Sequence, residues 1–422
     1  MAFMEYKPIT CVWEVTMGCN MRCGHCGSSC KTALPGELTT DEALTLADMI
    51  ADMKLSWVTL SGGEPLTRKD LTKIISRLTS QNVHANIISN GWEVNDTNAK
   101  EFKDAGVSTF AISIDGTEEI HDKIRRPGAF ARAKNAFGIL NRNGIYTAGI
   151  TTISQENIDH LGKIKDELIN MGVNMWQIQI GLPMGNFARH KNWMITPSQV
   201  QDIIDFCYDT TLENKILIQP ADCIGYYNSK LDFVNSLNEC GRWVGCNAGV
   251  RSFGILHNGD ILGCTSIRDK SFIEGNIREK SLRQIWENPN SFAWRRNLSK
   301  DKLSGDCGKC RYGDECLGGC PNSRLTTKGS IYKENLYCSF NYNIKKFRKK
   351  LLSYNNIDVL SGKAHQCINV GSFQEASLIS ERILDLDPTN NEGTSLKRIA
   401  NTKCGNSNED TFSNESLLEK SV

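Results

Sequence analysis

Short apolar runs alternate with segments of helical periodicity from residue 10 to about residue 219. The apolar runs predict strands over residues 12–15, 57–60, 83–88, 109–114, 146–153 and 175–180. The periodic segments predict helices over residues 39–53, 69–81, 97–105, 130–143, 158–171 and 196–213. Six strand–helix units in series indicate a parallel α/β sheet. Length alone fits a full barrel, a partial barrel and an open sheet equally well.

Helix-end signals support several of these elements. Thr39 and Glu42 have the spacing of a capping box at the start of the first predicted helix. Gly106 and Gly172 each follow a predicted helix directly, at the position where a left-handed residue ends a helix. These signals predict where the helices begin and end without reference to the rest of the chain.

The character of the sequence changes after residue 219. Residues 223–338 are rich in Gly, Asn and Cys, and they predict short elements only. Residues 251–262 predict a hairpin around the turn 257–260, and residues 281–296 predict a helix. A segment with so few apolar residues needs cross-links such as bound metal to stabilise its fold, as small metal-binding domains do.

The chain is predicted to be helical from residue 342 onward. Residues 371–376 and 384–390 resemble a single tetratricopeptide repeat that ends at Pro388. About three such repeats are usually needed to bury a continuous core. We therefore expect these helices to pack on the preceding domain or on a partner. Residues 401–422 are polar and predict disorder.

Composition narrows the classes of function. The length of 422 residues predicts two or three domains, or one large domain with additions. The net charge is +1 and no basic stripe is present, so nucleic acid and acidic membrane surfaces are not expected partners. No apolar run reaches the roughly 18 residues of a membrane span, and residues 1–10 lack a signal-peptide layout. We therefore expect a cytoplasmic protein.

Cysteine is the most informative residue type in the sequence. The chain has 17 cysteines, with five from Cys11 to Cys30, nine from Cys223 to Cys338, and none between Cys30 and Cys207. In a reducing compartment, thiols bind metal or perform redox chemistry more often than they pair as disulfides. The two clusters of cysteines are therefore candidate metal sites.

The first candidate site follows the first predicted strand. Cys19, Cys23 and Cys26 lie on one tight loop. A [4Fe–4S] cluster normally takes four thiolates, so three ligands leave one iron open, as a reactive metal site requires. The alternatives are a zinc site completed by His25 or Cys30, and a set of free thiols.

The second motif, Gly62-Gly63-Glu64-Pro65, lies at the end of the second predicted strand. Ligands of α/β sheets bind at the carboxyl ends of strands, and both motifs fall there. Two glycines let the backbone approach a ligand closely, and a carboxylate at this point can receive an ammonium group. The pair of motifs therefore favours a reactive metal site with a bound ligand over a structural zinc site.

The two motifs together resemble those of the radical S-adenosylmethionine superfamily. The resemblance implies an α/β fold with a partial (β/α)6 TIM-like barrel. It implies that the three cysteines of the first motif hold a [4Fe–4S] cluster, whose open iron is chelated by the amino and carboxylate groups of S-adenosylmethionine. It also implies that Gly62, Gly63 and Glu64 contact that amino group.

Two further segments extend the resemblance. Residues 88–91 and 113–116 are similar to segments that line the S-adenosylmethionine and substrate pocket in this family. Ser113 and Asp115 are therefore expected pocket residues, although each segment taken alone is better explained as a turn. His25 is expected to pack near the adenine rather than to bind metal.

The later cysteines resemble the SPASM extension of the same superfamily, including Gly259 and the run 318–321. The resemblance implies two closed auxiliary [4Fe–4S] clusters, and thus three clusters in all. Auxiliary cluster I is expected on Cys240, Cys246, Cys264 and Cys320. Auxiliary cluster II is expected on Cys307, Cys310, Cys316 and Cys338. Two zinc sites are the alternative. Ordinary thiols are expected at Cys11, Cys30, Cys207, Cys223, Cys367 and Cys404, with Cys223 near enough in sequence to be a spare ligand.

These assignments divide the chain into four parts. A barrel is expected over residues 1–222, a SPASM domain over 223–341, a helical extension over 342–400 and a disordered tail over 401–422. The expected partners include a one-electron reductant such as flavodoxin or ferredoxin.

The resemblance implies reductive cleavage of S-adenosylmethionine and hydrogen abstraction by a 5′-deoxyadenosyl radical. Most SPASM proteins act on peptides or proteins, so the leading expectation is an oxidoreductase or maturase that crosslinks or oxidises such a substrate. The auxiliary clusters would accept electrons, and the C-terminal helical extension is a candidate docking surface. Thr265 stands where sulfatase maturases carry an acid, which argues against that assignment. The alternatives are an enzyme for a haem-like or sugar precursor, and a non-catalytic Fe–S electron carrier.

Overall fold

The computed structural model describes residues 6–221, 223–238 and 243–406, with side chains up to residue 403. One sheet of ten strands runs through the molecule in the order β10-β9-β8-β1-β2-β3-β4-β5-β6-β7. The barrel strands are β1 Thr10–Thr16, β2 Trp57–Gly62, β3 His84–Ser89, β4 Val107–Ser113, β5 Tyr146–Ile153, β6 Met175–Ile180 and β7 Leu217–Pro220. From β1 to β7, neighbouring strands are parallel in all six pairings.

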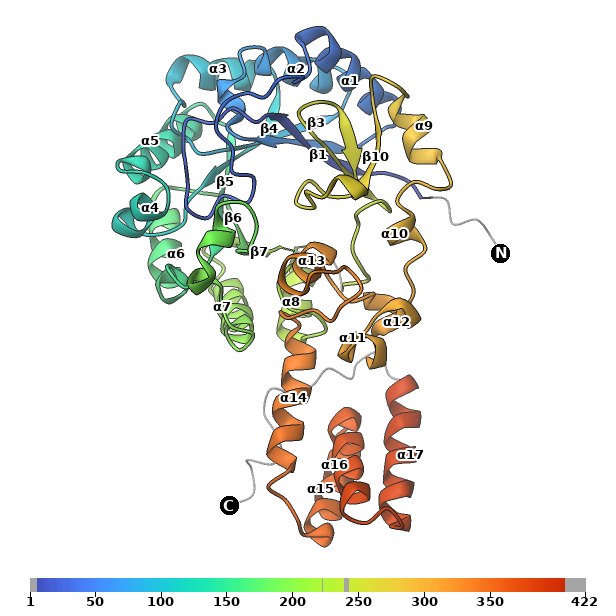
Figure 1. Ribbon diagram of the computed structural model, residues 1–422. Helices are drawn as coiled ribbons and strands as arrows, with labels where there is room; N and C mark the ends of the chain where they lie inside the picture. The colour runs from blue at the N-terminus through green and yellow to red at the C-terminus, as the bar shows by residue number, and fades with distance from the viewer. Residues whose placement is uncertain (1–5, 222, 239–242, 407–422) are drawn as a thin grey trace.

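Helices cover the outer face of the curved sheet (Figure 1). They are α1 Thr40–Asp52, α2 Leu71–Thr79, α3 Asp96–Asp104, α4 Glu118–Ile124, α5 Ala129–Arg142, α6 Leu161–Asn170 and α7 Gln199–Glu213. The buried core between the two layers includes Trp13, Phe110 and Trp176. This arrangement confirms the expected TIM-like α/β barrel, and the pairings among the described residues leave β10 and β7 as its edges.

The local helix signals are confirmed. Thr39 Oγ1 accepts the Glu42 N–H at 3.3 Å, and Glu42 Oε2 accepts the Thr39 N–H at 2.8 Å. Gly106 and Gly172 have φ angles of 85° and 68°, the left-handed conformation that suits a residue after a helix.

Two barrel elements were not predicted. Strand β7 has four residues and ends in Pro220, so it shows no extended apolar run. Its pairing with β6 supplies the stabilisation that its own sequence lacks. Helix α4 has seven residues, too few to show a helical period.

The predicted hairpin is confirmed, but it is not isolated. It consists of β8 Ser252–Ile255 and β9 Asp260–Leu262, and β10 Ile273–Asn276 pairs with β9. Strand β8 also pairs in parallel with β1, with Thr10 opposite Ser252 and Trp13 opposite Ile255. Part of the segment after the barrel therefore continues the barrel sheet.

The single helix predicted over residues 281–296 is wrong. The structure has two short helices, α9 Leu282–Glu287 and α10 Ala293–Arg296. Pro289 lies between them and cannot donate a helical hydrogen bond, and Phe292 has a φ of 56°. The buried ring of Phe292 packs on Trp286, which fixes this break.

The remaining short helices surround the later cysteines. They are α8 Ser229–Leu237, α11 Asp306–Lys309, α12 Gly313–Cys316 and α13 Pro321–Lys328. None of the helices in the described part of the chain combines the length and the apolar character needed to cross a membrane.

The C-terminal helices project from the rest of the molecule (Figure 1). They are α14 Ser339–Leu351, α15 Ile357–Asn369, α16 Phe373–Leu386 and α17 Asn391–Asn406. These helices share a separate apolar core that includes Leu351, Leu360, Ile379 and Leu396. The tetratricopeptide-like segment forms α16 and the turn after it, and α16 packs mainly on α15 and α17. Helix α17 extends past residue 401, where disorder was predicted, and residues 407–422 lie outside the described residues.

Candidate metal centres

The first cysteine loop follows β1 and is tied to two other segments. The Cys19 N–H donates to Lys31 O at 2.8 Å, and the Gly24 N–H donates to Ile124 O at 2.8 Å. Cys23 is buried and Cys19 and Cys26 are half-buried. The three thiols pack in one small cluster with Met21, as expected for ligands on one tight loop.

The end of β2 docks directly on this loop. The Gly63 N–H donates to Thr16 O at 2.7 Å, and the Glu64 N–H donates to Gly18 O at 2.8 Å. A Cβ on Gly62 would lie 2.3 Å from Thr16 O, and one on Gly63 would lie 2.1 Å from Gly18 O. The contact with the chain's own loop therefore requires glycine at both positions. Their expected contact with a bound ligand stays a prediction.

Glu64 is buried, with three donors of the chain around its carboxylate. Oε1 accepts from Ser89 Oγ at 2.8 Å and from the Leu66 N–H at 3.1 Å, and Oε2 accepts from the Asn90 N–H at 2.7 Å. Burial raises the pKa of Glu64 to about 6, against these hydrogen bonds. The carboxylate thus joins the ends of β2 and β3 behind the cysteine loop.

Asp115 belongs to a buried polar network and is fully shielded from solvent. Its Oδ2 lies 2.5 Å from Arg125 Nε and 3.0 Å from His25 Nε2, and its Oδ1 accepts the Thr152 N–H at 2.9 Å. Burial acts to raise the pKa of Asp115, but the charges on Arg125 and His25 outweigh it and hold that pKa well below its usual range. His25 therefore contacts a carboxylate of the protein itself. Ser113 is half-buried at the end of β4.

The electrostatic environments of the first three thiols differ. Arg125 Nη1 lies 3.9 Å from Cys23 Sγ. Burial raises the pKa of Cys23 to about 11, and Arg125 opposes that rise. A hydrogen bond from Cys30 lowers the pKa of Cys26 to about 5. Cys30 is therefore a direct neighbour of Cys26.

Asn186 was not predicted, yet it fastens the loop from the far side of the barrel. Its N–H donates to Cys26 O at 2.8 Å, its Nδ2 donates to Cys23 O at 3.0 Å, and its Oδ1 accepts from Ser29 Oγ at 3.0 Å. Asn186 lies in the segment after β6. Only its position after a strand of the predicted parallel sheet could have indicated this role, because the carboxyl ends of parallel strands lie at the same edge of a sheet.

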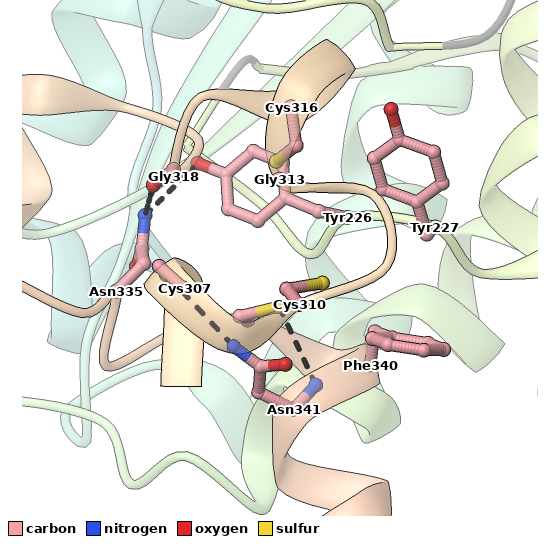
Figure 2. A pocket seen from close by; sticks show the side chains of 11 residues that line it. Tyr226, Tyr227, Cys307, Cys310, Gly313, Cys316, Gly318, Asn335, Phe340 and Asn341 are labelled. Atoms are coloured by element: carbon pink, nitrogen blue, oxygen red, sulfur yellow. Dashed lines mark hydrogen bonds between the residues drawn. The ribbon is translucent and has the colours of Figure 1, made fainter. Parts of the chain in front are cut away.

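The four thiols expected to hold auxiliary cluster II line one pocket, with Tyr226 and Tyr227 beside it (Figure 2). They are Cys307, Cys310, Cys316 and Cys338. Asn341 donates its N–H to Cys338 Sγ at 3.5 Å and its Nδ2 to Cys307 Sγ at 3.9 Å. These side chains come from α11, α12 and the start of α14, so tertiary folding brings them together.

Three of the four thiols expected to hold auxiliary cluster I are described. Cys320 donates its N–H to Tyr226 Oη at 2.8 Å, and Cys246 Sγ accepts the Ala248 N–H at 3.5 Å. Burial, followed by the negative charge on Cys246, Cys223 and Cys264, raises the pKa of Cys320 well above its usual value. Cys240 lies outside the described residues.

Backbone N–H groups point at the sulfurs of three expected cluster ligands, which are Cys19, Cys246 and Cys338. Hydrogen bonds to the sulfurs are among the features that set the reduction potential of an iron–sulfur cluster. Across residues 6–221, 223–238 and 243–403, no three His, Cys, Asp or Glu side chains converge on one metal-ion position.

A cavity of about 550 Å³ opens beside the first cysteine loop. Gly27 and Ser28 of that loop, Met184 of the segment after β6, and Arg268 and Asn322 of the later segment line it. Arg268 forms an ion pair with Glu14 and a hydrogen bond with Ser28. The cavity therefore lies between the barrel and the cysteine-rich segment, and its size is typical of small-ligand sites.

Two family models match separate segments of the chain. The model of the radical SAM superfamily matches residues 13–168, and that of SPASM, an iron–sulfur cluster-binding domain, matches residues 246–311. The AdoMet-dependent heme synthase of Methanosarcina barkeri (strain Fusaro / DSM 804) is 30% identical over 353 residues, covering 81% of this chain and 99% of the relative. The mycofactocin maturase MftC of Mycobacterium ulcerans (strain Agy99) is 28% identical over 327 residues, covering 76% and 85%. The crystal structure of Streptococcus suis SuiB bound to S-adenosylmethionine matches with a TM-score of 0.64 at 15% identity, covering 78% of this chain and 77% of that one.

Proposed function

Since the chain belongs to the radical S-adenosylmethionine superfamily and carries a SPASM iron–sulfur domain, we propose that it abstracts hydrogen from a peptide or protein substrate. The observation that carries the reaction class is the docking of the Gly63–Glu64 backbone on the first cysteine loop, at 2.7 and 2.8 Å. When bound, a [4Fe–4S] cluster and S-adenosylmethionine supply the 5′-deoxyadenosyl radical, which no side chain can provide. Flavodoxin or ferredoxin is the proposed reductant.

The barrel residues hold and orient this centre. Cys19, Cys23 and Cys26 are the proposed ligands of the site cluster, because they share one loop and one packed cluster. Gly62, Gly63, Glu64 and Ser113 form the proposed S-adenosylmethionine wall at the ends of β2 and β4.

The buried network behind this loop fixes its shape. Asp115 is proposed to act from this position by holding Arg125 against Cys23 and keeping His25 in place. A fixed cation beside one thiolate stabilises its charge in a site with little water. Asp115 would then affect S-adenosylmethionine binding indirectly, through the shape of the cysteine loop, without touching the bound molecule itself.

The two later cysteine sets are proposed to hold auxiliary clusters, giving three clusters in all. One set surrounds the pocket of Figure 2, and Cys246, Cys264 and Cys320 belong to the other. Closed cysteine sets suit electron transfer, so these clusters would accept the electron released when the substrate radical is oxidised. In this proposal the barrel ends at residue 222, the SPASM domain at residue 341 and the helical extension at residue 400.

The cavity beside the cysteine loop supports substrate access to this centre. It is open to solvent on one side and is lined by polar groups of Ser28, Asp269 and Asn322. A peptide backbone offers donors and acceptors that match such groups. The similarity to mycofactocin maturase agrees with a peptide substrate, and the C-terminal helices remain a proposed docking surface.

A second candidate substrate is a haem-like tetrapyrrole precursor. One observation favours it: the chain covers 99% of the length of the AdoMet-dependent heme synthase at 30% identity. The remaining fifth of the chain has no counterpart in that alignment, because the match covers 81% of it. The two candidates predict different ligands for the same cavity.

The reaction class is tested with anaerobically reconstituted protein. We expect about twelve irons per chain, from three four-iron clusters, and 5′-deoxyadenosine after addition of S-adenosylmethionine and dithionite. Replacing Cys19, Cys23 and Cys26 together by Ala should leave about eight irons and abolish 5′-deoxyadenosine. Zinc in place of iron and sulfide, or no 5′-deoxyadenosine from the wild type, would refute the proposal.

The substrate class is tested separately. Co-expression with short reading frames next to its gene should give a peptide whose mass is reduced by loss of hydrogen. Titration with haem, the product named for the heme synthase relative, should leave the haem Soret band unchanged if the substrate is a peptide. A saturable Soret shift that Asn322→Ala weakens would favour the tetrapyrrole candidate instead.

A further inference from the structure

Arg324 is a buried cation that forms no ion pair with the described residues. It lies on α13, and its side chain is fully shielded from solvent. Its Nη2 donates to Leu317 O at 3.1 Å, whereas Nε and Nη1 have no hydrogen-bond partner in the described part of the chain. A guanidinium cannot lose its proton in a protein, so burying it costs free energy unless a negative charge lies beside it. An anion is therefore expected next to Arg324.

A second arginine of the cysteine-rich segment shows how the chain can stabilise such a group by itself. Arg296 lies over the rings of Trp286 and Phe292, with its Cζ at 4.7 and 4.8 Å from their centroids. Its Nε donates to Gly249 O at 2.7 Å. The faces of aromatic rings attract a cation, so this arginine has its stabilising groups within the chain. Arg324 differs in this respect, because its one hydrogen bond to the described residues from the guanidinium goes to a single carbonyl oxygen.

The guanidinium of Arg324 lies between the two later sets of cysteines. Gly318 lines the pocket of the thiols expected to hold auxiliary cluster II (Figure 2). A Cβ on Gly318 would lie 2.7 Å from Arg324 Nη1 and 2.9 Å from Arg324 Cζ, so the guanidinium packs directly on this glycine. Cys320, which is expected in the other set, caps the start of α13, and its carbonyl oxygen accepts the Arg324 N–H at 3.4 Å. The side chain therefore contacts the turn that joins Cys316 of one set to Cys320 of the other.

Electrostatic interactions agree with this position. Burial lowers the pKa of Arg324, whereas negative charge on four nearby groups acts to raise it. These groups are Cys307, Tyr226, Cys320 and Cys316. Three of the four are expected cluster ligands, and they come from both sets. The clusters themselves are therefore the expected source of the anionic charge beside this guanidinium.

We propose that Arg324 is a counter-ion shared by the two auxiliary clusters, with its Nε and Nη1 groups donating to cluster sulfurs. The inference rests on the proposed function, because the anions that it pairs with are the proposed clusters. A [4Fe–4S] cluster with four thiolate ligands carries a net negative charge, and its reduction potential depends on that charge and on hydrogen bonds to its sulfurs. A fixed positive charge between the two clusters therefore raises the reduction potential of both.

The raised potentials favour the proposed direction of electron transfer. When the substrate radical is oxidised, it loses one electron and an auxiliary cluster gains that electron, while Arg324 keeps its proton. Reduction adds negative charge to the cluster, and a nearby cation stabilises such charge most strongly in a site with little water. Arg324 would thus make both auxiliary clusters better electron acceptors.

The test measures the reduction potentials of the auxiliary clusters in the full-length chain. Replacing Cys19, Cys23 and Cys26 by Ala removes the proposed site cluster, so an EPR-monitored redox titration of this background reports the auxiliary clusters alone. In this background Arg324→Met should lower both midpoint potentials, each by about 60 mV, a tenfold change for one electron. Arg324→Lys keeps the charge and should leave both potentials unchanged. Arg296→Met is the matched control, and it should change neither potential.

The other outcomes distinguish the inference from the proposed function. Unchanged potentials in Arg324→Met, or a fall in only one of them, would overturn the shared counter-ion. Equal losses of potential or of iron in Arg324→Met and Arg324→Lys would overturn it as well, because the side chain would then act by packing. If Arg324→Met fails to bind iron, retention of both clusters and both potentials by Arg324→Lys supports the role of the charge. Fewer than about eight irons in the background itself would refute the proposed auxiliary clusters.

Discussion

Gly63→Ala should separate the two motifs on which the proposed reaction depends. The added Cβ would lie 2.1 Å from Gly18 O, 2.7 Å from Gly18 C and 2.9 Å from Met17 O. All three are backbone atoms of the first cysteine loop, so no flexible side chain can move aside. The end of β2 and the loop must therefore move apart by about 1 Å to reach ordinary van der Waals contact.

The cost follows from the contacts that this movement breaks. The Gly63 N–H and Glu64 N–H bonds to the loop are lost, at about 1 kcal/mol each. The added methyl group in a closely packed site costs a further 1–3 kcal/mol, roughly. We expect the free energy of unfolding of the apo-protein to fall by about 3–5 kcal/mol.

Urea denaturation of the metal-free protein measures this loss, and iron content with 5′-deoxyadenosine yield reports the site. Gly138→Ala is the control, because Gly138 is exposed in the middle of α5 and its Cβ would meet nothing within 4 Å. That variant should gain about 1 kcal/mol from helix propensity and keep full activity. If Gly63→Ala proved as stable as wild type with normal S-adenosylmethionine cleavage, the docking geometry described above would be refuted.

Three further predictions concern buried ionisable side chains. Asp115→Asn should destabilise the apo-protein by about 3–5 kcal/mol in urea denaturation, because it leaves Arg125 buried without its counter-ion; a loss below about 1 kcal/mol would contradict the network. Burial and the charge of Arg125 lower the pKa of His121 to about 3, so the unfolded chain binds the extra proton below about pH 6.5. Stability should therefore fall as the pH drops from about 6.5, by up to ~1.4 kcal/mol per unit, and His121→Asn should flatten that slope. Arg324 is fully buried and close to Cys307, Cys316 and Cys320. Arg324→Gln removes a positive charge beside the expected clusters, so it should lower the reduction potential of an auxiliary cluster by roughly 60 mV, a tenfold change for one electron. Arg324→Lys keeps the charge and should retain the wild-type potential in an EPR-monitored redox titration.

Local signals made the barrel predictable from sequence. The Thr39–Glu42 capping box and the left-handed Gly106 are decided by residues within one turn of the helix, and both were confirmed. The strands of a parallel sheet are buried on both faces, so their apolar runs are visible without tertiary information. Strand β7 has no such run, because its position depends on a register with β6.

Long-range contacts explain what the sequence could not predict. Asn186 binds the backbone of Cys23 and Cys26 from more than 150 positions away, and asparagine in a loop has many local explanations. The Gly62-Gly63 pair was found by its motif, but its physical reason, the close approach of the loop at residues 16–18, needs coordinates. The left-handed conformation of Phe292 is stabilised by the contact of its buried ring with Trp286, and local sequence rules do not predict such a contact.

The pairing of β8 with β1 has a consequence for electron transfer between the proposed clusters. The first cysteine loop begins where β1 ends, and Cys264 follows the hairpin formed by β8 and β9. Because Trp13 is in register with Ile255, the two cysteine segments leave the same sheet at fixed positions. The ion pair between Glu14 of β1 and Arg268, which follows Cys264, joins the two parts of the chain a second time. The C-terminal helices have their own core and are not held by this strand pairing. By contrast, hydrogen-bonded strands inside a barrel do not change register. The distance between the site cluster and auxiliary cluster I would therefore be set by the pairing of β1 with β8 and would stay constant during turnover.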